Sequence, residues 1–218
     1  MLRLGVLVSG RGTNLQALLD ACASPGFPAE VVLVGCNRAG AAAITRAAAA
    51  RVPVCLVDRT AIPSRAERQR LVLRALREGK VELVVLAGFD EILLSELIQA
   101  FANRIINTHP SLLPAFGGTM HAVEQALAHG VKVSGCTVHL VTDQLDGGPI
   151  LFQRCVEVRD DDDVGSLHAR IREQEHSLLP EVVRAFAEGR VRLDGNGRAR
   201  VIGSSGSLQS TVDSQQST

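Results

Sequence analysis

Short, almost continuously apolar segments alternate with longer amphipathic segments through the first half of the chain. The apolar segments are rich in Val and Leu, as expected for parallel strands covered on both faces; they are Leu2–Val8, Glu30–Cys36, Val52–Val57 and Leu83–Ala87. The segments between them carry Leu, Ala and Arg at helical spacing and end near Gly or Pro; they are Thr13–Ser24, Ala41–Ala50 and Ser64–Gly79. This alternation predicts an α/β fold with a single Rossmann-like, doubly wound, mainly parallel sheet and helices on both faces.

The second half of the chain carries longer elements of both kinds. The pattern predicts a buried strand at Arg104–Ile106, a helix from near His121 to His129, two strands over Val133–Val141 and Ile150–Val158, and a long amphipathic helix ending near Glu188. The acidic run Asp160–Asp163 precedes that helix and suits the positive end of its dipole. Residues 203–218 are rich in Ser and Gln and lack aromatics, which predicts a disordered tail behind one domain over residues 1–202.

Composition narrows the classes of function that this chain could have. With 218 residues and 46% hydrophobic content, the chain can bury one good core. Lys plus Arg number 23 and Asp plus Glu number 23, so no overall field favours nucleic acid or an anionic membrane, and small-molecule substrates are expected. The five cysteines are widely spaced without a CxxC pair, which is typical of reduced thiols in a cytosolic protein. No apolar run suits a signal peptide or a membrane span, so we expect a cytoplasmic location. The expected assembly is a monomer or homodimer.

Three polar side chains form a candidate catalytic set, and each of them follows an apolar segment. They are Asn107 and His109, in the stretch Asn-Thr-His-Pro-Ser-Leu-Leu-Pro, and Asp146, in Leu-Asp-Gly-Gly-Pro. Asn can donate to an oxyanion, His titrates near neutrality and Asp can orient the imidazole, so the trio suits acyl transfer. Open α/β sheets bind ligands at strand ends, which predicts that the three groups converge there. Taken alone, His109 could be a structural residue whose hydrogen bonds are satisfied within the fold, and Asp146 could be a turn residue.

A loop of small residues, Ser9-Gly-Arg-Gly-Thr-Asn14, lies between the first predicted strand and helix. Its backbone N–H groups could hold a phosphate at the helix N-terminus. The loop fits the dinucleotide fingerprint poorly, because Leu15 stands at the third glycine position, and it lacks the Lys-Ser/Thr ending of a Walker loop. A phosphomonoester is therefore the better ligand, although a tight turn capped by Thr13 or Asn14 would explain the same residues.

Five motifs together resemble the phosphoribosylglycinamide formyltransferase family of folate-dependent enzymes. They are SGRGTNLQALLDA, VVLAGF, INTHPSLLPAF, GCTVHLVTDQLDGGPIL and the QEH of the last long helix. The resemblance spans about Leu2 to Val201 and implies transfer of formyl from 10-formyltetrahydrofolate, as co-substrate, to the amino group of glycinamide ribonucleotide in purine biosynthesis. No metal is expected. By the same resemblance the catalytic residues would be Asn107, His109 and Asp146.

The resemblance also implies two sets of substrate contacts. The ribonucleotide and its phosphate would be bound by Gly12, Thr13, Asn14, Arg172 and Glu175. Folate would be bound by Arg65, Leu86, Ile92, Leu93, Val141 and Thr142. From the residues alone, Arg172 and Glu175 could equally be an exposed helix face, and the apolar positions could be ordinary core.

The chain departs from the family pattern at three places. Arg172 stands where the family commonly has Lys or Gln, and Arg can contact a phosphate with two hydrogen bonds. Asp90-Glu91 follows Gly88-Phe89 where the family has Met and then Arg or Lys. Two acids near the folate entrance would oppose the anionic glutamate tail. The loop Phe116–Met120 replaces a Pro-Gly turn and is expected to close over substrate differently.

Other functions share part of these motifs. Other folate-dependent formyltransferases and formyltetrahydrofolate hydrolases would carry the same trio, so the trio predicts a reaction class better than an acceptor. The early glycine-rich loop favours a small phosphorylated acceptor. A non-catalytic module that binds nucleotide or folate stays open as an alternative of a different class, and Asp90-Glu91 is the main reason to keep it.

Overall fold

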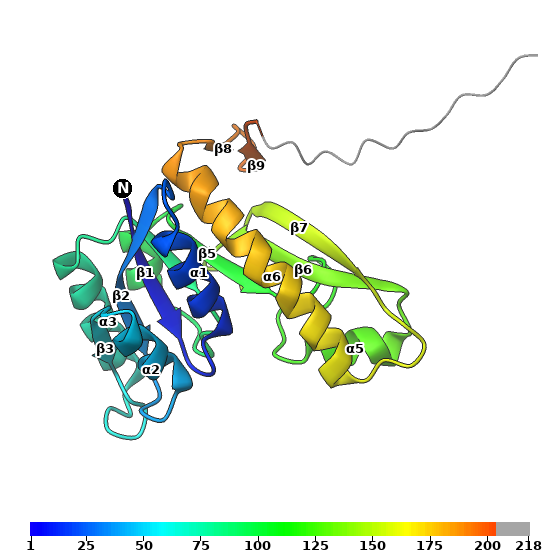
Figure 1. The fold of residues 1–218 in the computed structure, drawn as a ribbon, viewed down its shortest axis with the longest axis horizontal. Coiled ribbons are helices and arrows are strands. Elements are labelled where there is room, and N and C mark those ends of the chain that lie inside the picture. Colours follow the sequence, from blue (N-terminus) through cyan, green and yellow to red (C-terminus); the bar gives the residue numbers. More distant parts are fainter. Residues whose placement is uncertain (204–218) are drawn as a thin grey trace, which may run out of the picture.

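One seven-stranded sheet runs through the structure, a computed structural model that describes residues 1–203 (Figure 1). Its order is β3-β2-β1-β4-β5-β6-β7. The strands are β1 (Leu2–Val8), β2 (Ala29–Cys36), β3 (Val54–Leu56), β4 (Leu83–Leu86), β5 (Ile105–His109), β6 (Val133–Leu140) and β7 (Ile150–Glu157). β1 to β5 pair in parallel, and β6 and β7 are antiparallel additions. The predicted mainly parallel α/β fold is therefore confirmed.

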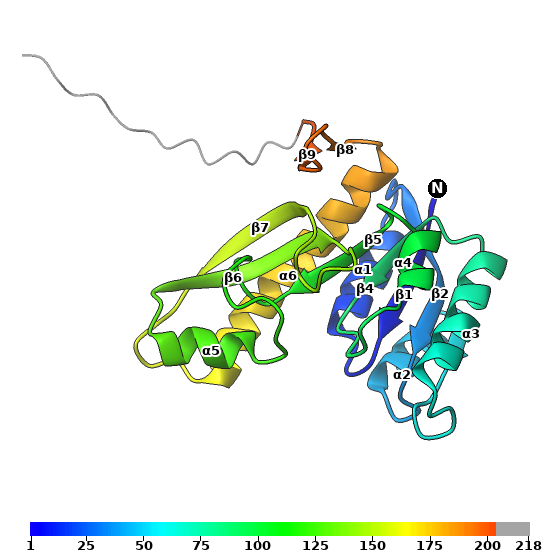
Figure 2. The same ribbon diagram turned by 180° about the vertical axis from the view of Figure 1, so that it is seen from behind.

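Helices cover both faces of this sheet, as the two opposite views show (Figures 1 and 2). α1, α2, α5 and α6 contribute to the core on one face, and α3 and α4 to the core on the other. The helices are α1 (Thr13–Ala23), α2 (Ala42–Ala49), α3 (Arg65–Glu78), α4 (Ser95–Ala100), α5 (Ala122–His129) and α6 (Val164–Ala187). Because every central strand is covered twice, its residues are apolar at successive positions.

Strand β1 illustrates how the apolar pattern builds two cores. Leu4 and Val6 face the helices α1 and α6, whereas Leu7 faces α3, and all three are fully buried. Side chains alternate between the two faces along a strand, so a continuous apolar run fills both cores at once.

The acidic run before α6 caps that helix. Asp163 is the N-cap, and its side chain accepts from the Ser166 backbone N–H.

The order of the strands places a crevice beside β1 and β4. From β1 the chain winds outwards through β2 and β3 and then returns to β4 on the other side of β1. The loops after β1 and β4 therefore separate at the carboxyl edge, where such sheets bind ligands. β5 pairs with β4 only as far as Asn107, opposite Leu86, and continues through His109 paired with β6 alone. The site residues of β5 thus extend beyond the end of β4.

Two parts of the structure differ from the sequence-based expectation. The strand expected at Arg104–Ile106 continues through Asn107 and His109, so these side chains lie within β5 and not after it. Helix α4 and a separate hairpin of β8 (Val191–Leu193) and β9 (Ala199–Val201) were not predicted, since each is too short to show a period. The disordered tail is expected over residues 203–218, of which 204–218 lie outside the described residues.

Candidate active site

A cavity of about 590 Å³ opens at the carboxyl edge of β1 and β4. Its walls are the glycine-rich loop after β1, the segment 86–93 after β4, the extension of β5, the loop 141–146 between β6 and β7, and one face of α6. This volume is within the range of small-molecule sites in proteins. The cavity contains most of the residues that the motifs had singled out.

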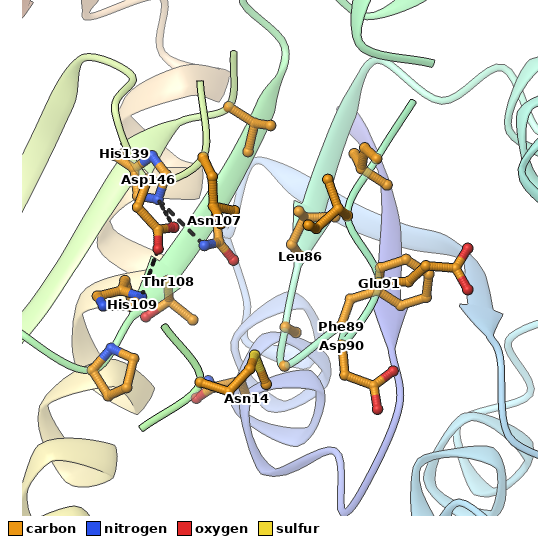
Figure 3. Close-up of a pocket in the computed structure, with 18 of the residues that line it drawn as sticks. Asn14, Leu86, Phe89, Asp90, Glu91, Asn107, Thr108, His109, His139 and Asp146 are labelled. Carbon is orange, nitrogen blue, oxygen red and sulfur yellow. Dashed lines mark hydrogen bonds and ion pairs between the residues drawn. The ribbon is translucent and has the colours of Figure 1, made fainter. Parts of the chain in front are cut away.

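The three candidate catalytic side chains meet in this cavity (Figure 3). Asn107 and His109 are two apart on β5 and therefore lie on one face of the strand. Asp146 arrives from the β6–β7 loop and places Oδ2 3.4 Å from Nδ1 of His109. The side chains of His109 and Asp146 are only 6% and 8% exposed. The predicted convergence of an amide, an imidazole and a carboxylate is confirmed as geometry.

A second histidine joins this group from β6. His139 lies opposite Asn107 in the β5–β6 pairing. Its Nε2 atom is 3.3 Å from Nδ2 of Asn107 and 3.5 Å from Oδ1 of Asp146. Its position among apolar residues of a strand is equally typical of a core residue, but the structure places it in contact with two of the three candidate catalytic groups.

Hydrogen bonds to carbonyls fix one proton on each imidazole. Nε2 of His109 is 2.9 Å from the Phe116 carbonyl, and Nδ1 of His139 is 2.9 Å from the Leu140 carbonyl. A carbonyl only accepts, so each of these nitrogens donates. The other nitrogen of each ring faces Asp146 and carries a proton only when that ring is cationic. A neutral His139 accepts from the Asn107 amide, whereas a cationic one donates to Asp146.

Asp146 is held in its charged form. Burial raises the pKa of this carboxyl, but a hydrogen bond with His139, another from the Gly118 N–H at 2.9 Å and the nearby charge of His109 outweigh burial, so the pKa lies below the ordinary value of aspartate. An ionised Asp146 can orient the histidines and stabilise positive charge on either ring.

The loop Phe116–Met120 contacts the catalytic groups through its backbone. The Phe116 carbonyl accepts from His109, and the Gly118 N–H donates to Asp146. Phe116 has a left-handed backbone, with φ 55°, and its ring meets His129 edge to face at 5.5 Å between centroids. The loop Phe116–Met120 therefore contacts both members of the His109–Asp146 pair through its backbone.

The glycine-rich loop presents an uncapped helix N-terminus to the cavity. Gly12 is the N-cap of α1, with φ 70°, and no side chain caps the helix. The possibility that Thr13 or Asn14 caps the turn is therefore wrong. A Cβ on Gly12 would lie 2.7 Å from the Cβ of Ala43 on α2, so packing as well as conformation requires glycine. The free N–H groups of the first turn suit an anion.

Helix α6 contributes a buried carboxylate and a free cation to the cavity. Glu175 is 5% exposed and accepts from Asn14 Nδ2 at 3.0 Å and from Thr108 Oγ1 at 3.2 Å. Asn14 keeps one buried atom, Oδ1, without a hydrogen-bond partner. Arg172 lines the cavity one turn earlier and forms no ion pair with the residues that the structure describes. This region can receive both an anionic group and hydrogen-bond donors of a ligand.

The residues expected to contact folate line the opposite part of the cavity, with one exception. Leu86 and Leu93 are buried, Ile92 is 57% exposed, and Val141 and Thr142 come from the loop after β6. Arg65 is exposed at the first position of α3 and does not line the cavity. The structure thus brings together all the proposed site residues except Arg65.

Asp90 and Glu91 are neutralised by partners, which corrects their expected effect on the folate entrance. Asp90 accepts from Asn37 at 3.0 Å and pairs with Arg38 and Arg59. Glu91 pairs with Arg68 at 2.6 Å. Figure 3 shows both carboxyl groups directed away from Asn107 and His109. The two acids therefore do not act as free negative charges at the entrance.

Two other kinds of site are absent from residues 1–203. Within this range no set of three His, Cys, Asp or Glu side chains is arranged to hold a metal ion. No helix in the same range is both long and apolar enough to cross a membrane.

The contacts made by backbone groups and by α3 could not be predicted from the sequence pattern. The Phe116 carbonyl and the Gly118 N–H have no side-chain signature. The partnership of Arg68 with Glu91 joins residues that are 23 positions apart on separate elements. Only the coincidence of an unusual acid at position 91 with an arginine on the amphipathic helix could have suggested it.

Comparisons with known proteins agree with this geometry. The sequence profile described as Formyl transferase matches residues 2–183. The phosphoribosylglycinamide formyltransferase of Mycobacterium tuberculosis is 47% identical over 193 residues, which cover 88% of each chain. The trifunctional purine biosynthetic protein adenosine-3 of Gallus gallus is 40% identical over 90% of this chain, which spans only 19% of that protein.

A solved structure has the same fold as this chain. Glycinamide ribonucleotide transformylase 1 from Symbiobacterium toebii superposes with a TM-score of 0.88 at 47% identity, covering 92% of this chain and 94% of that one. The match therefore extends over the whole sheet and the cavity at its edge. The chain belongs to the formyl transferase family.

Proposed function

We propose that this protein transfers the formyl group of 10-formyltetrahydrofolate to the amino group of glycinamide ribonucleotide, a step of purine biosynthesis. The observation that carries the proposal is the convergence of Asn107, His109 and Asp146 beside an uncapped helix N-terminus in one cavity. Relatives with the matching names, of which this chain covers about nine-tenths, support the same substrates.

The trio has a separate task at each stage of the reaction. Attack of the primary amine on the formyl carbon produces a tetrahedral oxyanion, to which the Asn107 amide and a cationic His109 would donate. Asn107 Nδ2 has two N–H groups, and His139 occupies only one of them. Asp146 stabilises positive charge on the imidazoles and so assists transfer of the amine proton towards the departing folate nitrogen.

The His109 ring must break one of its present contacts before it can donate to the substrate. Nε2 donates to the Phe116 carbonyl and Nδ1 faces Asp146, so neither nitrogen is free. We expect the loop Phe116–Met120 to shift when substrates bind, releasing Nε2 towards the formyl oxygen.

The two substrates would occupy opposite parts of the cavity. Gly12, Thr13 and Asn14 would hold the ribonucleotide with Arg172 on its phosphate and Glu175 on its polar groups. The apolar residues of the segment 86–93 and of the loop after β6 would receive the pterin, and Arg65 would meet the glutamate tail outside the cavity. No metal takes part in this scheme.

The wider setting of the reaction is part of the same proposal. Residues 1–202 would form the catalytic domain and act on small molecules, as a monomer or homodimer in the cytoplasm. Equal numbers of acidic and basic residues and five unpaired cysteines support this setting.

A steady-state assay tests the reaction and its acceptor. Purified protein is mixed with 10-formyltetrahydrofolate and either glycinamide ribonucleotide, another primary amine or water alone. The proposal predicts formylation of the ribonucleotide as the dominant reaction, and its loss in Asp146→Asn although that variant still unfolds cooperatively. Dominant hydrolysis would assign the chain to a hydrolase, and folate binding without turnover would assign it to a binding module.

A further inference from the structure

The segment Glu91–Leu94 forms one wall of the cavity and is held from behind by helix α3. Glu91, Ile92 and Leu93 line the cavity, and none of the four belongs to a helix or strand. A loop in this position has no sheet partner to fix its backbone, so its shape depends on side-chain contacts. Two neighbouring residues of α3, Arg68 and Gln69, supply these contacts.

Arg68 ties the wall to the start of its own helix. Its Nε and Nη2 atoms donate to Oε2 of Glu91 at 3.1 and 2.6 Å. Nη1 donates to the carbonyls of Ile62 and Pro63 at 2.5 and 2.8 Å. Both charged side chains are only 7% exposed. The pair is therefore desolvated and satisfied on both sides, the condition under which a buried ion pair holds a fixed geometry.

Gln69 fixes the backbone of the same segment. Its Nε2 atom donates to Oε1 of Glu91 at 3.0 Å and to the Ile92 carbonyl at 2.9 Å. Its Oε1 atom accepts from the Leu94 N–H at 2.7 Å. Both the nitrogen and the oxygen of the side-chain amide therefore form hydrogen bonds, and they hold backbone groups on either side of Leu93.

Several backbone groups between these anchors have no partner. Among the described residues, the N–H groups of Ile92 and Leu93 form no hydrogen bond, and the Leu93 carbonyl accepts none. They stand in a segment that lines the cavity, so a bound ligand can pair with them. Their spacing is set by the contacts from α3 on both sides, and the wall is therefore organised before any ligand enters.

We propose that Arg68 and Gln69 are positioning residues that set the affinity for folate by fixing the Glu91–Leu94 wall. This inference rests on the proposed function, since it takes the ligand of this wall to be the pterin of the co-substrate. The Arg68–Glu91 pair carries no net charge, and Glu91 is the anchor that joins the wall to α3.

The test compares two variants of the wall with a matched pair elsewhere on α3. Arg68→Met combined with Glu91→Gln removes both charges together, because removing one alone would leave a buried unpaired ion. Gln69→Met removes the remaining contacts without changing charge. The control, Arg74→Met with Glu78→Gln, neutralises an exposed ion pair on the same helix, whose side chains are 75% and 64% exposed.

Binding of tetrahydrofolate is measured by absorbance under anaerobic conditions, which is direct because the chain contains no Trp or Tyr. We expect the dissociation constant and the KM for 10-formyltetrahydrofolate to rise about tenfold or more in both wall variants. The KM for the ribonucleotide and kcat at saturating folate should stay within about threefold of wild type. The control should match the wild type in all four quantities.

The outcomes of this test distinguish a failure of the positioning role from a failure of the proposed function. A wall variant that melts like the wild type and binds tetrahydrofolate equally tightly would overturn the positioning role while leaving formyl transfer intact. Equal losses of affinity for folate and ribonucleotide would also overturn it, since they would indicate a general structural role. If the wild type bound no folate, the proposed function would fail, and the inference with it.

Discussion

Asp146 connects the two histidines of the site, and its charge is the basis of their orientation. One oxygen faces His109 and the other faces His139, while the Gly118 N–H holds the side chain from the loop. Because each imidazole already donates to a carbonyl, only a cationic ring can donate to Asp146. The site is therefore arranged to stabilise one imidazolium, the form that can donate to an oxyanion.

Asn107→Ala should lower kcat about 100- to 1,000-fold, the usual cost of losing one oxyanion donor. The melting temperature should change little, since Asn107 is only half-buried and contacts His139 through a single hydrogen bond. Gln125→Ala, an exposed position on α5 outside the cavity, is the control. A loss below fivefold in Asn107→Ala would show that this amide does not stabilise the transition state.

The stability of the fold should depend on the ionisation of Asp146. A carboxyl whose pKa is lower in the folded than in the unfolded chain adds stability above its unfolded value, about 3.9 for aspartate, and this contribution disappears as acid protonates the folded form. The difference in unfolding free energy between the wild type and Asp146→Asn should therefore shrink as pH falls below about 4. Urea unfolding at several pH values measures it. A difference that stays constant through this range would contradict the lowered pKa.

The catalytic trio could be predicted because its members stand in recognisable local motifs. Their side chains carry the chemistry, and the rule that ligands bind at the carboxyl edge of parallel strands predicted where they meet. His139 could not be assigned in the same way, since its apolar neighbours in a strand are equally typical of a core position. The carbonyl of Phe116 acts through the backbone, so no residue type marks its role.

Among the elements, the turn from β1 into α1 carries the strictest packing requirement. Gly12 combines a left-handed backbone with close contact to α2, whereas Gly10, two residues earlier, has open space around its Cα. The alternation of strands and helices predicted this turn, but the requirement for glycine at one position and not at the other depends on α2, which is remote in sequence. Spacing along the chain could not distinguish the two.

Gly12→Ala should lower the unfolding free energy by about 1–3 kcal/mol, the usual cost of a strained backbone at a non-glycine residue. It should also raise the KM for the ribonucleotide, because the N–H groups of α1 would shift. Gly10→Ala is the matched control for stability and should change the unfolding free energy little. Denaturant unfolding and steady-state kinetics on both variants check the prediction. Equal effects of the two substitutions would show that contact with Ala43 is not what requires glycine.

In the whole molecule, one sheet supplies both the core and the site. Length and apolar content predict one domain, and the sheet from β1 to β7 carries one core cluster on each of its faces. The hairpin of β8 and β9 is a separate sheet that contacts β7 at the C-terminal end of α6, and none of its residues lines the cavity. Short strands of three residues leave no periodic signal, which is why the sequence pattern did not predict them.

A chain ending at residue 203 should keep the melting temperature and the transfer rate of the full-length protein. The reason is that all the proposed site residues and both core clusters lie within residues 1–203. Thermal unfolding and steady-state kinetics on both lengths measure the effect. A loss of more than about threefold in kcat/KM would assign residues 204–218 a part in the reaction.

The fate of the formyl carbon tests the central claim most directly. 10-Formyltetrahydrofolate labelled with ¹³C in the formyl group is mixed with the wild-type protein and glycinamide ribonucleotide in water, and the label is followed by ¹³C NMR. The formyl transferase described here should place the label in the formamide of the ribonucleotide, and Asp146→Asn should leave it on folate. Label released as formate, or retained on folate by the wild type, would contradict the claim.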